Sequence, residues 1–176
     1  DITELLERLR RRPEVEAVSL SQNSYPYNGS NSTDLVRYDT LQSPGWTIRR
    51  MVTPDFVRVF RYQGTRGETP EQLAEMLERG GFLASDNLYR KYDRKLTEFV
   101  GKRFQLFGDT TKTYQLGAAL QNVRYHDYDQ ARSSYCFLAK QSFYYADLEL
   151  CVRVREGQDN NFITKLKEHS ESQFRI

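Results

Sequence analysis

The sequence contains few of the residues that bind transition metals or form disulfides. Its 176 residues include only two cysteines, Cys136 and Cys151, and two histidines. None of them stands at the CxxC or HxxxH spacing that zinc sites use, so we expect no metal site and no cofactor. Both cysteines lie in strand-like segments, a setting that favours two buried free thiols over a disulfide.

Long apolar runs and an excess of charge of one sign are also missing. No segment approaches the roughly 20 apolar residues of a membrane-spanning helix, and the charged first residues do not form a signal peptide. Lysine and arginine number 26 against 24 aspartates and glutamates, a formal net charge of +2. This balance indicates an ordinary solvated surface, so we expect neither a membrane partner nor direct nucleic-acid binding.

Alternating strand patterns are what the sequence does have. The stretch 144–157, YYADLELCVRVREG, alternates leucine and valine with charged residues, which predicts a strand with one apolar and one charged face. Further strands are expected over 14–20, 34–40, 46–52, 56–62 and 135–144, and strand-like runs fill 87–114. Residues 113–125 fit a strand or a helix.

Helices are predicted near both ends and in the middle of the chain. Residues 2–12 carry leucines on one helical face, and a second helix starts with Phe162. Between them, Thr69-Pro70-Glu71-Gln72 has the pattern of a capping box, and Gly80-Gly81 ends the helix that follows. Residues 22–33 are rich in serine, asparagine and glycine, which predicts a flexible loop.

These elements together predict a fold class. The sequence shows no internal repeat and no regular alternation of strands with helices, which argues against a parallel sheet. We therefore expect an α+β fold: a mostly antiparallel β-barrel of about eight strands with flanking helices, forming a single domain over residues 1–176.

Four stretches, taken in order, resemble one known family. They are ITELLERLRRRPEVEAVSL, DLVRYDTLQSPGWTIRR, the pair VRVFRYQ and TPEQLAEMLERGGFLASDNLYRK, and YADLELCVRVREGQDNNFITKLKE. Their order is similar to that of subunit 18 of the Mediator head module. The match covers nearly the whole chain, although each stretch describes a fold and none is a catalytic signature.

The resemblance implies a function without catalysis. Members of that family are antiparallel barrels that pair with Mediator subunit 20, which has a similar fold, and a helix of subunit 8 tethers the pair. The chain would then be a scaffold subunit of this transcription coactivator complex in the nucleus, contacting RNA polymerase II, and not an enzyme.

The same barrel architecture allows an enzymatic alternative, a metal-dependent triphosphate-tunnel phosphohydrolase such as an RNA 5′-triphosphatase. Such an enzyme needs inward-facing carboxylates for a divalent metal and cations for the phosphates. The metal ligands would be Glu14, Glu16, Asp147 and Glu149, and the phosphate-binding residues would be Arg58, Arg61, Arg153 and Arg155. Alternation places Val18 and Leu20 on the face of the first acidic pair, where a tunnel enzyme would continue with lysine, and this favours the scaffold.

Two smaller hypotheses concern single segments. VFRYQG followed by PEQL and GGF resembles the start of bacterial ADP-ribosyltransferase toxins, in which Arg61 would contact NAD, but no late Glu-x-Glu strand follows Asn161. The aromatic residues Phe143, Tyr144 and Tyr145 are candidates for a partner-binding edge, because aromatic side chains are enriched at interface centres. Core packing explains them equally well.

Overall fold

The structure of the chain, a computed structural model, describes residues 2–22, 32–106, 110–121, 123, 134–139 and 148–173. Its helices are α1 (Ile2–Arg10), α2 (Phe56–Val59), α3 (Pro70–Glu78) and α4 (Asp159–Gln173), with two 3₁₀ helices, η1 (Asp86–Tyr92) and η2 (Leu96–Phe99). The strands are β1 (Val15–Gln22), β2 (Ser32–Asp34), β3 (Val36–Tyr38), β4 (Leu41–Gln42), β5 (Thr47–Val52), β6 (Phe82–Ser85), β7 (Arg103–Leu106), β8 (Thr113–Leu120), β9 (Ser134–Ala139) and β10 (Leu148–Val154). None of the helices described is at once long enough and apolar enough to cross a membrane.

One mixed, open sheet joins the strands. Its order is β10-β1-β5-β9-β6-β8-β7-β3-β4, with β2 paired to β5 beside this path. The pairs β5 with β9 and β6 with β8 are parallel. Because β10 and β4 stand at opposite ends of the order, the sheet does not close.

The predicted antiparallel barrel is therefore wrong, although the α+β class is correct. The parallel pairs were missed because their strands are far apart in the chain. The connection from β6 to β8 runs through η1, η2 and β7, and not through a long crossover helix of the kind that usually signals parallel pairing.

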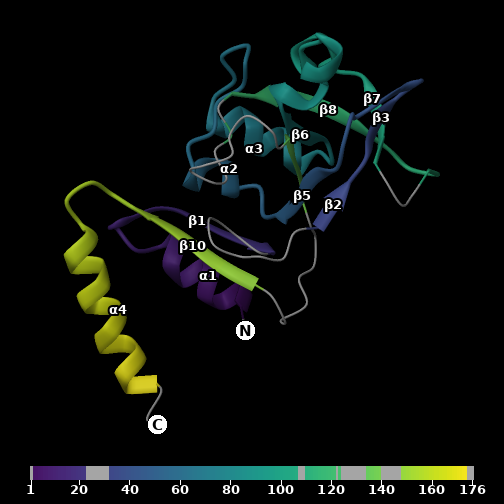
Figure 1. Cartoon of the computed structure of the whole chain (residues 1–176). Helices are drawn as coiled ribbons and strands as arrows, with labels where there is room; N and C mark the ends of the chain where they lie inside the picture. Colours follow the sequence, from purple (N-terminus) through teal and green to yellow (C-terminus); the bar gives the residue numbers. More distant parts are fainter. Residues whose placement is uncertain are drawn as a thin grey trace.

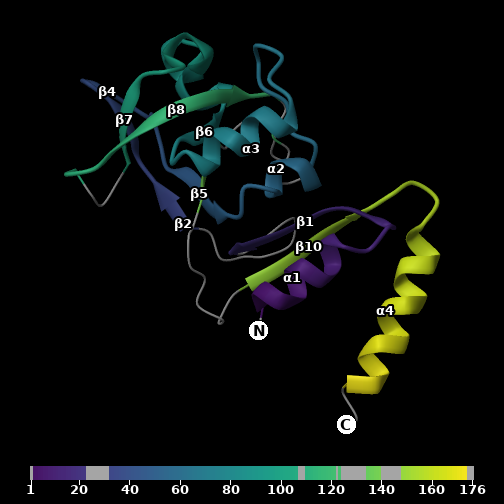
Figure 2. The same ribbon diagram turned by 180° about the vertical axis from the view of Figure 1, so that it is seen from behind.

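The molecule has two lobes of unequal size (Figure 1). The main lobe is built from the described residues between 32 and 139. The end lobe consists of α1, β1, β10 and α4, and α4 extends away from the main lobe in both views (Figures 1 and 2). The backbone ladder between the lobes is short: Ser21 of β1 pairs with Val52 of β5, and Thr53 N–H donates to Leu20 O at 2.9 Å.

Apolar residues cover both faces of the main sheet. Every residue of β6 is buried, and so are four of the six residues of β9. On one face, Leu83 and Phe137 pack with residues of α2 and α3, and on the other Phe82 and Cys136 pack with residues of η1 and η2. These central strands are continuous apolar runs because neither of their faces meets water.

Helix α3 forms as its sequence predicts. Thr69 Oγ1 accepts from Gln72 N–H at 3.3 Å, and Gln72 Oε1 accepts from Thr69 N–H at 2.9 Å, which completes the capping box. At the other end, Gly80 has φ +83°, a left-handed conformation that ends the helix at little steric cost.

Two other segments differ from the prediction. Residues 56–62 were expected as a strand, but Phe56–Val59 is a single helical turn, α2, with three apolar residues buried. The first part of the run expected as strands from residue 87 instead lies in the 3₁₀ helices η1 and η2, and strand structure resumes only at Arg103. The ambiguous region contains a strand, β8, up to Leu120. Most of the loop expected over 22–33 lies outside the described residues.

Candidate functional site

The charged face of β10 looks toward helix α2. On the opposite face, Val152 and Val154 pack against residues of α1, as alternation predicts. Toward α2, β1 presents Ser19 and Ser21, both fully buried. From β10, Arg153 Nη1 donates to Val59 O, the last carbonyl of α2, at 2.7 Å. Helix α2 therefore lies between the end lobe and the core of the main lobe.

A β-bulge in β1 determines where Glu16 points. Val15 pairs with Val154 and Ala17 pairs with Arg153, so Glu16 is the extra residue between them. Because a bulge interrupts the two-residue alternation, Glu16 does not share the face of Val18. The sequence argument that grouped Glu16 with Val18 and Leu20 was therefore wrong in its geometry.

Glu16 links three elements through two arginines. Arg61 Nη2 lies 3.0 Å from each of its carboxylate oxygens, and Arg153 Nε lies 3.6 Å from one of them. Arg61 follows α2 in a left-handed conformation, φ 51°, which is unfavourable for a residue with a Cβ atom. The carboxylate of Glu16 on β1 thus pairs with Arg61, which follows α2, and with Arg153 on β10.

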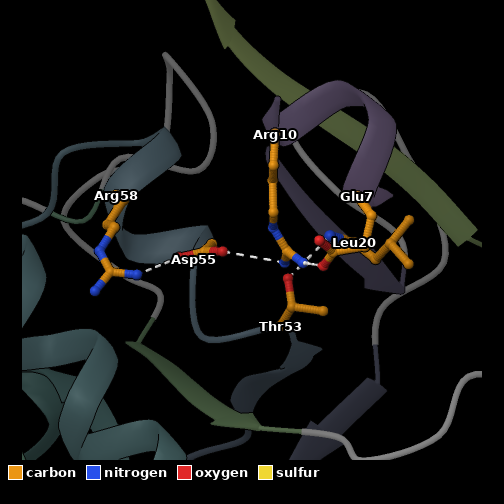
Figure 3. Close-up of polar contacts among 6 residues, drawn as sticks. All are labelled: Glu7, Arg10, Leu20, Thr53, Asp55 and Arg58. Atoms are coloured by element: carbon orange, nitrogen blue, oxygen red, sulfur yellow. Dashed lines mark hydrogen bonds and ion pairs between the residues drawn. The ribbon is translucent and has the colours of Figure 1, made fainter. Parts of the chain in front are cut away.

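We call the contact of α1, β1 and β10 with α2 and its flanking residues the junction. A second chain of ion pairs crosses it (Figure 3). Arg10 of α1 donates to Glu7 at 2.9 Å and to Asp55 at 3.1 Å, and Asp55 also accepts from Arg58 of α2. Next to it, Thr53 Oγ1 accepts from Leu20 N–H at 3.0 Å. Asp55 therefore receives one cation from each lobe.

Helix α4 is anchored to the end lobe by a buried acid and an aromatic ring. Glu14 is 2% exposed, and its carboxylate lies 3.1 Å from Arg12 Nε and 3.8 Å from Lys165 Nζ of α4. Neither carboxylate oxygen has an aligned hydrogen bond among the described residues, so these ion pairs alone offset the cost of burial. Arg12 also stacks over the Phe162 ring, 5.4 Å from its centroid.

The structure brings together only some of the residues predicted for a tunnel site. Glu16, Arg61 and Arg153 meet, but Glu14 lies apart with Arg12 and Lys165. Of the other predicted residues, Arg58 binds Asp55, Arg155 Nε donates to Pro13 O at 2.9 Å, and Glu149 stands opposite Ser21 in the ladder.

The remaining predicted residues, Asp147, Phe143, Tyr144 and Tyr145, lie outside the described residues. In the part of the chain that is described, no group of three or more histidine, cysteine or acidic side chains is placed to hold a metal ion. Cys136 and Cys151 are free thiols, the first buried and the second half-buried.

Sequence reasoning missed Arg10, Thr53 and Asp55 of the junction. A signal was present, because Thr53-Pro54-Asp55 before an apolar run is typical of a helix start, as in α2. The alternation of VRVFRY hid it, since a helix of one turn is too short to show its own period. The partner of Arg10 is 45 residues away in the sequence, beyond any local pattern.

Comparison with known proteins identifies structures of the same fold. No family model matches the sequence, and no curated protein matches it either. Three solved structures are similar. A domain of a provisionally named permease protein from Porphyromonas gingivalis has a TM-score of 0.60 at 14% identity, and the match covers 95% of this chain and 68% of that one.

The other two are an extracellular domain and a periplasmic region. The extracellular domain of the noncanonical ABC-type transporter YknZ from Gram-positive bacteria has a TM-score of 0.58 at 16% identity, covering 90% of this chain and 75% of that one. The periplasmic region of MacB from Actinobacillus actinomycetemcomitans has a TM-score of 0.60 at 8% identity, covering 97% and 73%. At these identities, the likeness is one of fold.

These findings overturn the resemblance to Mediator subunit 18. The chain shares its open α+β fold with extracellular and periplasmic transporter domains, and it is not a barrel. The partners implied by that resemblance, a subunit 20-like barrel, a helix of subunit 8 and RNA polymerase II, are wrong, and so are the coactivator role and the nuclear location.

The alternative of a triphosphate-tunnel enzyme fails with the barrel. A triphosphate tunnel requires a closed bore, and the sheet is open. Arg61, which was suggested to contact NAD in an ADP-ribosyltransferase, binds the carboxylate of Glu16.

Proposed function

We propose that this chain is an extracytoplasmic domain of the permease of an ABC-type transporter. One observation carries the proposal: over 90% or more of the chain, the fold is that of extracellular or periplasmic regions of such proteins. Fold alone does not define function, so the arrangement of the chain ends is the second support.

Both ends of the described chain lie on the same side of the molecule. Helix α1 starts, and helix α4 finishes, at the lower edge of the end lobe in both views (Figures 1 and 2). A domain held to a membrane through both ends would therefore stand on its end lobe. The main lobe would project away from the bilayer.

The junction gives this arrangement a mechanical role. A displacement of α1 or β10 reaches the main lobe through Arg10 with Asp55, Glu16 with Arg61, and Arg153 with the end of α2. Ion pairs of this exposure contribute little individually, about 0–1 kcal/mol each, so the junction can yield without unfolding either lobe. We infer that the domain transmits motion between membrane segments and the outer surface.

We also propose that the domain is not an enzyme. Of the groups that suggested a catalytic site, Glu16 is neutralised by Arg61 and Arg153, and Arg58 by Asp55, and these pairs hold α2 between the lobes. Such pairing suits a mechanical contact, whereas catalysis needs groups directed at a substrate.

Cysteine labelling in intact cells tests the location. In the full-length protein, Arg79→Cys places a thiol on the exposed end of α3, where the arginine side chain is 79% exposed. We expect a membrane-impermeant maleimide to label this variant in intact cells. The parent is the control, because its Cys136 is buried and its Cys151 is half-buried.

Labelling of Arg79→Cys only after cell lysis would place the domain in the cytoplasm and refute the proposal. A thiol introduced on the ATPase side of the transporter should be labelled only after cell lysis. This control verifies that the reagent stays outside intact cells.

A further inference from the structure

The main lobe exposes the only tryptophan of the chain. Trp46 directly precedes β5 and is 57% exposed, the most of any large apolar residue in the described part of the chain. Pro44 and Gly45, just before it, are exposed as well. Exposed tryptophan is uncommon on a surface that contacts only water, and it is enriched at the energetic centres of protein interfaces.

Trp46 lines a hollow in which the described charged residues are both cations. The hollow has a volume of about 410 Å³, and its lining includes Pro44, Trp46, Asn87, Arg90, Lys91 and Ser134. Arg90 and Lys91 carry positive charge, and no aspartate or glutamate is among the described lining residues. An indole ring beside two cations favours a ligand with both an apolar group and a carboxylate.

The hollow continues along helix η1 into a second one. Asn87 and Arg90 also line a neighbouring hollow of about 480 Å³, which adds Arg94 and Lys95 together with two aspartates. One of these, Asp86, already accepts from Thr97 N–H at 3.0 Å and from Thr97 Oγ1 at 2.8 Å. Together the two hollows are lined by four cations and two aspartates, and one of the cations, Arg94, is paired with Glu98 at 2.9 Å.

The cations of this surface stand on a fixed support. Leu88 and Tyr89 of η1 are buried, and Tyr89 Oη donates to Val36 O at 3.3 Å and to Leu41 O at 3.2 Å. Helix η1 is thereby tied to β3 and β4. A surface whose backbone is held in place loses little conformational entropy when it binds a partner.

We propose that this surface, defined by Trp46, Asn87, Arg90 and Lys91, binds an acidic segment of a partner protein. Two hollows that share Asn87 and Arg90 suit an extended peptide better than a compact ion, and tryptophan with arginine is the composition of interface hot spots. The basic run would attract the acidic segment and orient it. Nucleic acid is disfavoured because the whole chain has a net charge of only +2.

This surface lies on the main lobe and does not rest on the proposed transporter function. Maleimide labelling tests the location of the domain, and the binding experiment below tests the surface. Either can fail without the other.

The fluorescence of Trp46 reports binding directly, because no other tryptophan contributes. The probe is a short peptide of alternating glutamate and proline, which contains no tryptophan, added to the chain at low ionic strength. We expect a saturable change in tryptophan emission that weakens as salt is added. A peptide with lysine in place of glutamate should give no change.

Charge reversal identifies the residues involved. Lys91→Glu should weaken peptide binding by about tenfold or more, since it places like charges in contact. Lys91 is exposed, so the variant should keep its fold, which circular dichroism verifies. The matched control, Arg79→Glu, alters an exposed cation at the end of α3 and should leave binding unchanged.

Three results would each overturn the proposal. The first is an unchanged emission with the acidic peptide, and the second is an equal response to the lysine peptide. The third is a stronger response to oligothymidylate or inorganic phosphate than to the peptide, which would assign the surface to nucleic acid or to a small anion.

Discussion

The two lobes of the molecule are stabilised in different ways. In the main lobe, both faces of the sheet are covered by buried side chains. The end lobe has one small cluster, Leu6, Leu9, Val15, Val18, Leu20 and Phe162. Its other face meets the main lobe through ion pairs and through Ser19 and Ser21, whose buried hydroxyls have no hydrogen-bond partner among the described residues. Apolar burial therefore dominates the main lobe, and polar contacts position the end lobe on it.

This difference predicts an order of events under stress. Ion pairs near the surface contribute about 0–1 kcal/mol each, whereas a buried large side chain contributes roughly 1.5–3 kcal/mol. The contacts of the end lobe should therefore open before the main lobe unfolds, as regions with little apolar burial generally do. The proposed transmission of motion would use this unequal distribution of stability.

The largest expected effect compares one phenylalanine from each lobe. Phe137 is fully buried, with ring centroids 5.5 Å from Phe56 and 5.6 Å from Tyr62. Phe137→Ala should lower the free energy of unfolding by about 3–5 kcal/mol in urea titration. Phe162→Ala should cost less and act locally, raising hydrogen exchange in α4. Equal global destabilisation by both variants would contradict the comparison.

A smaller effect is expected from the buried tyrosine of the main lobe. Burial raises the pKa of Tyr89 above its ordinary value, so the protonated phenol stabilises the fold below about pH 10, and this contribution is lost as the pH rises through the raised pKa. Tyr89→Phe should cost about 1 kcal/mol at neutral pH by removing its hydrogen bonds, and it should weaken the alkaline loss of stability. Urea titrations across alkaline pH measure this, and an identical alkaline loss in both proteins would refute it.

The junction should respond with a still smaller global effect. Glu16→Gln removes the negative charge between Arg61 and Arg153, and because these side chains are partly exposed the cost should be about 0.5–1 kcal/mol. Hydrogen exchange should rise in β1 and β10 and stay unchanged in β6.

Glu75→Gln is the matched control for this variant, since it removes the exposed ion pair with Arg79 on α3, far from the junction in the sequence. The same exchange pattern in both glutamine variants would mean that the ion pairs of Glu16 do not specifically hold β1 and β10.

The smallest expected effect concerns an ion pair wholly within the main lobe. The hydrogen bond from Arg94, at 2.9 Å, lowers the pKa of Glu98. Its contribution is therefore present above the ordinary glutamate pKa and is lost as the pH falls through the lowered value. Parent and Glu98→Gln should differ slightly in thermal stability at neutral pH and converge in acid. A difference that persists in strong acid would contradict this assignment.

The sequence predicted local structure well where the signal is local. Thr69 and Gln72 predict the start of α3 because a capping box lies within four residues. The alternation in β10 correctly places Val152 and Arg153 on opposite faces. The single-turn helix α2 was mistaken for a strand, since four residues cannot display a 3.6-residue period.

Local patterns carried a partial signal that the sheet is not a polar bore, but they carried none for the ion pairs of Glu16. FLAS and YCFLA, in β6 and β9, are continuous apolar runs, which indicate strands covered on both faces and count against a polar bore. No sequence pattern predicts the bulge at Glu16, yet the bulge determines the face of the sheet on which the Glu16 carboxylate lies. Its partner Arg61 is 45 residues away, a distance that only the tertiary fold spans.

The open sheet has one further consequence. A closed barrel has no strand edges, whereas the path of described strands in this sheet ends at β10 and at β4, and unpaired backbone groups at an edge invite pairing with another molecule. At one end β4 is only two residues long, and at the other β10 alternates Glu149 and Arg153 with its apolar residues. A short strand and a charged strand both discourage edge-to-edge pairing between molecules. Copies of this domain could therefore lie close together without polymerising through their sheet edges.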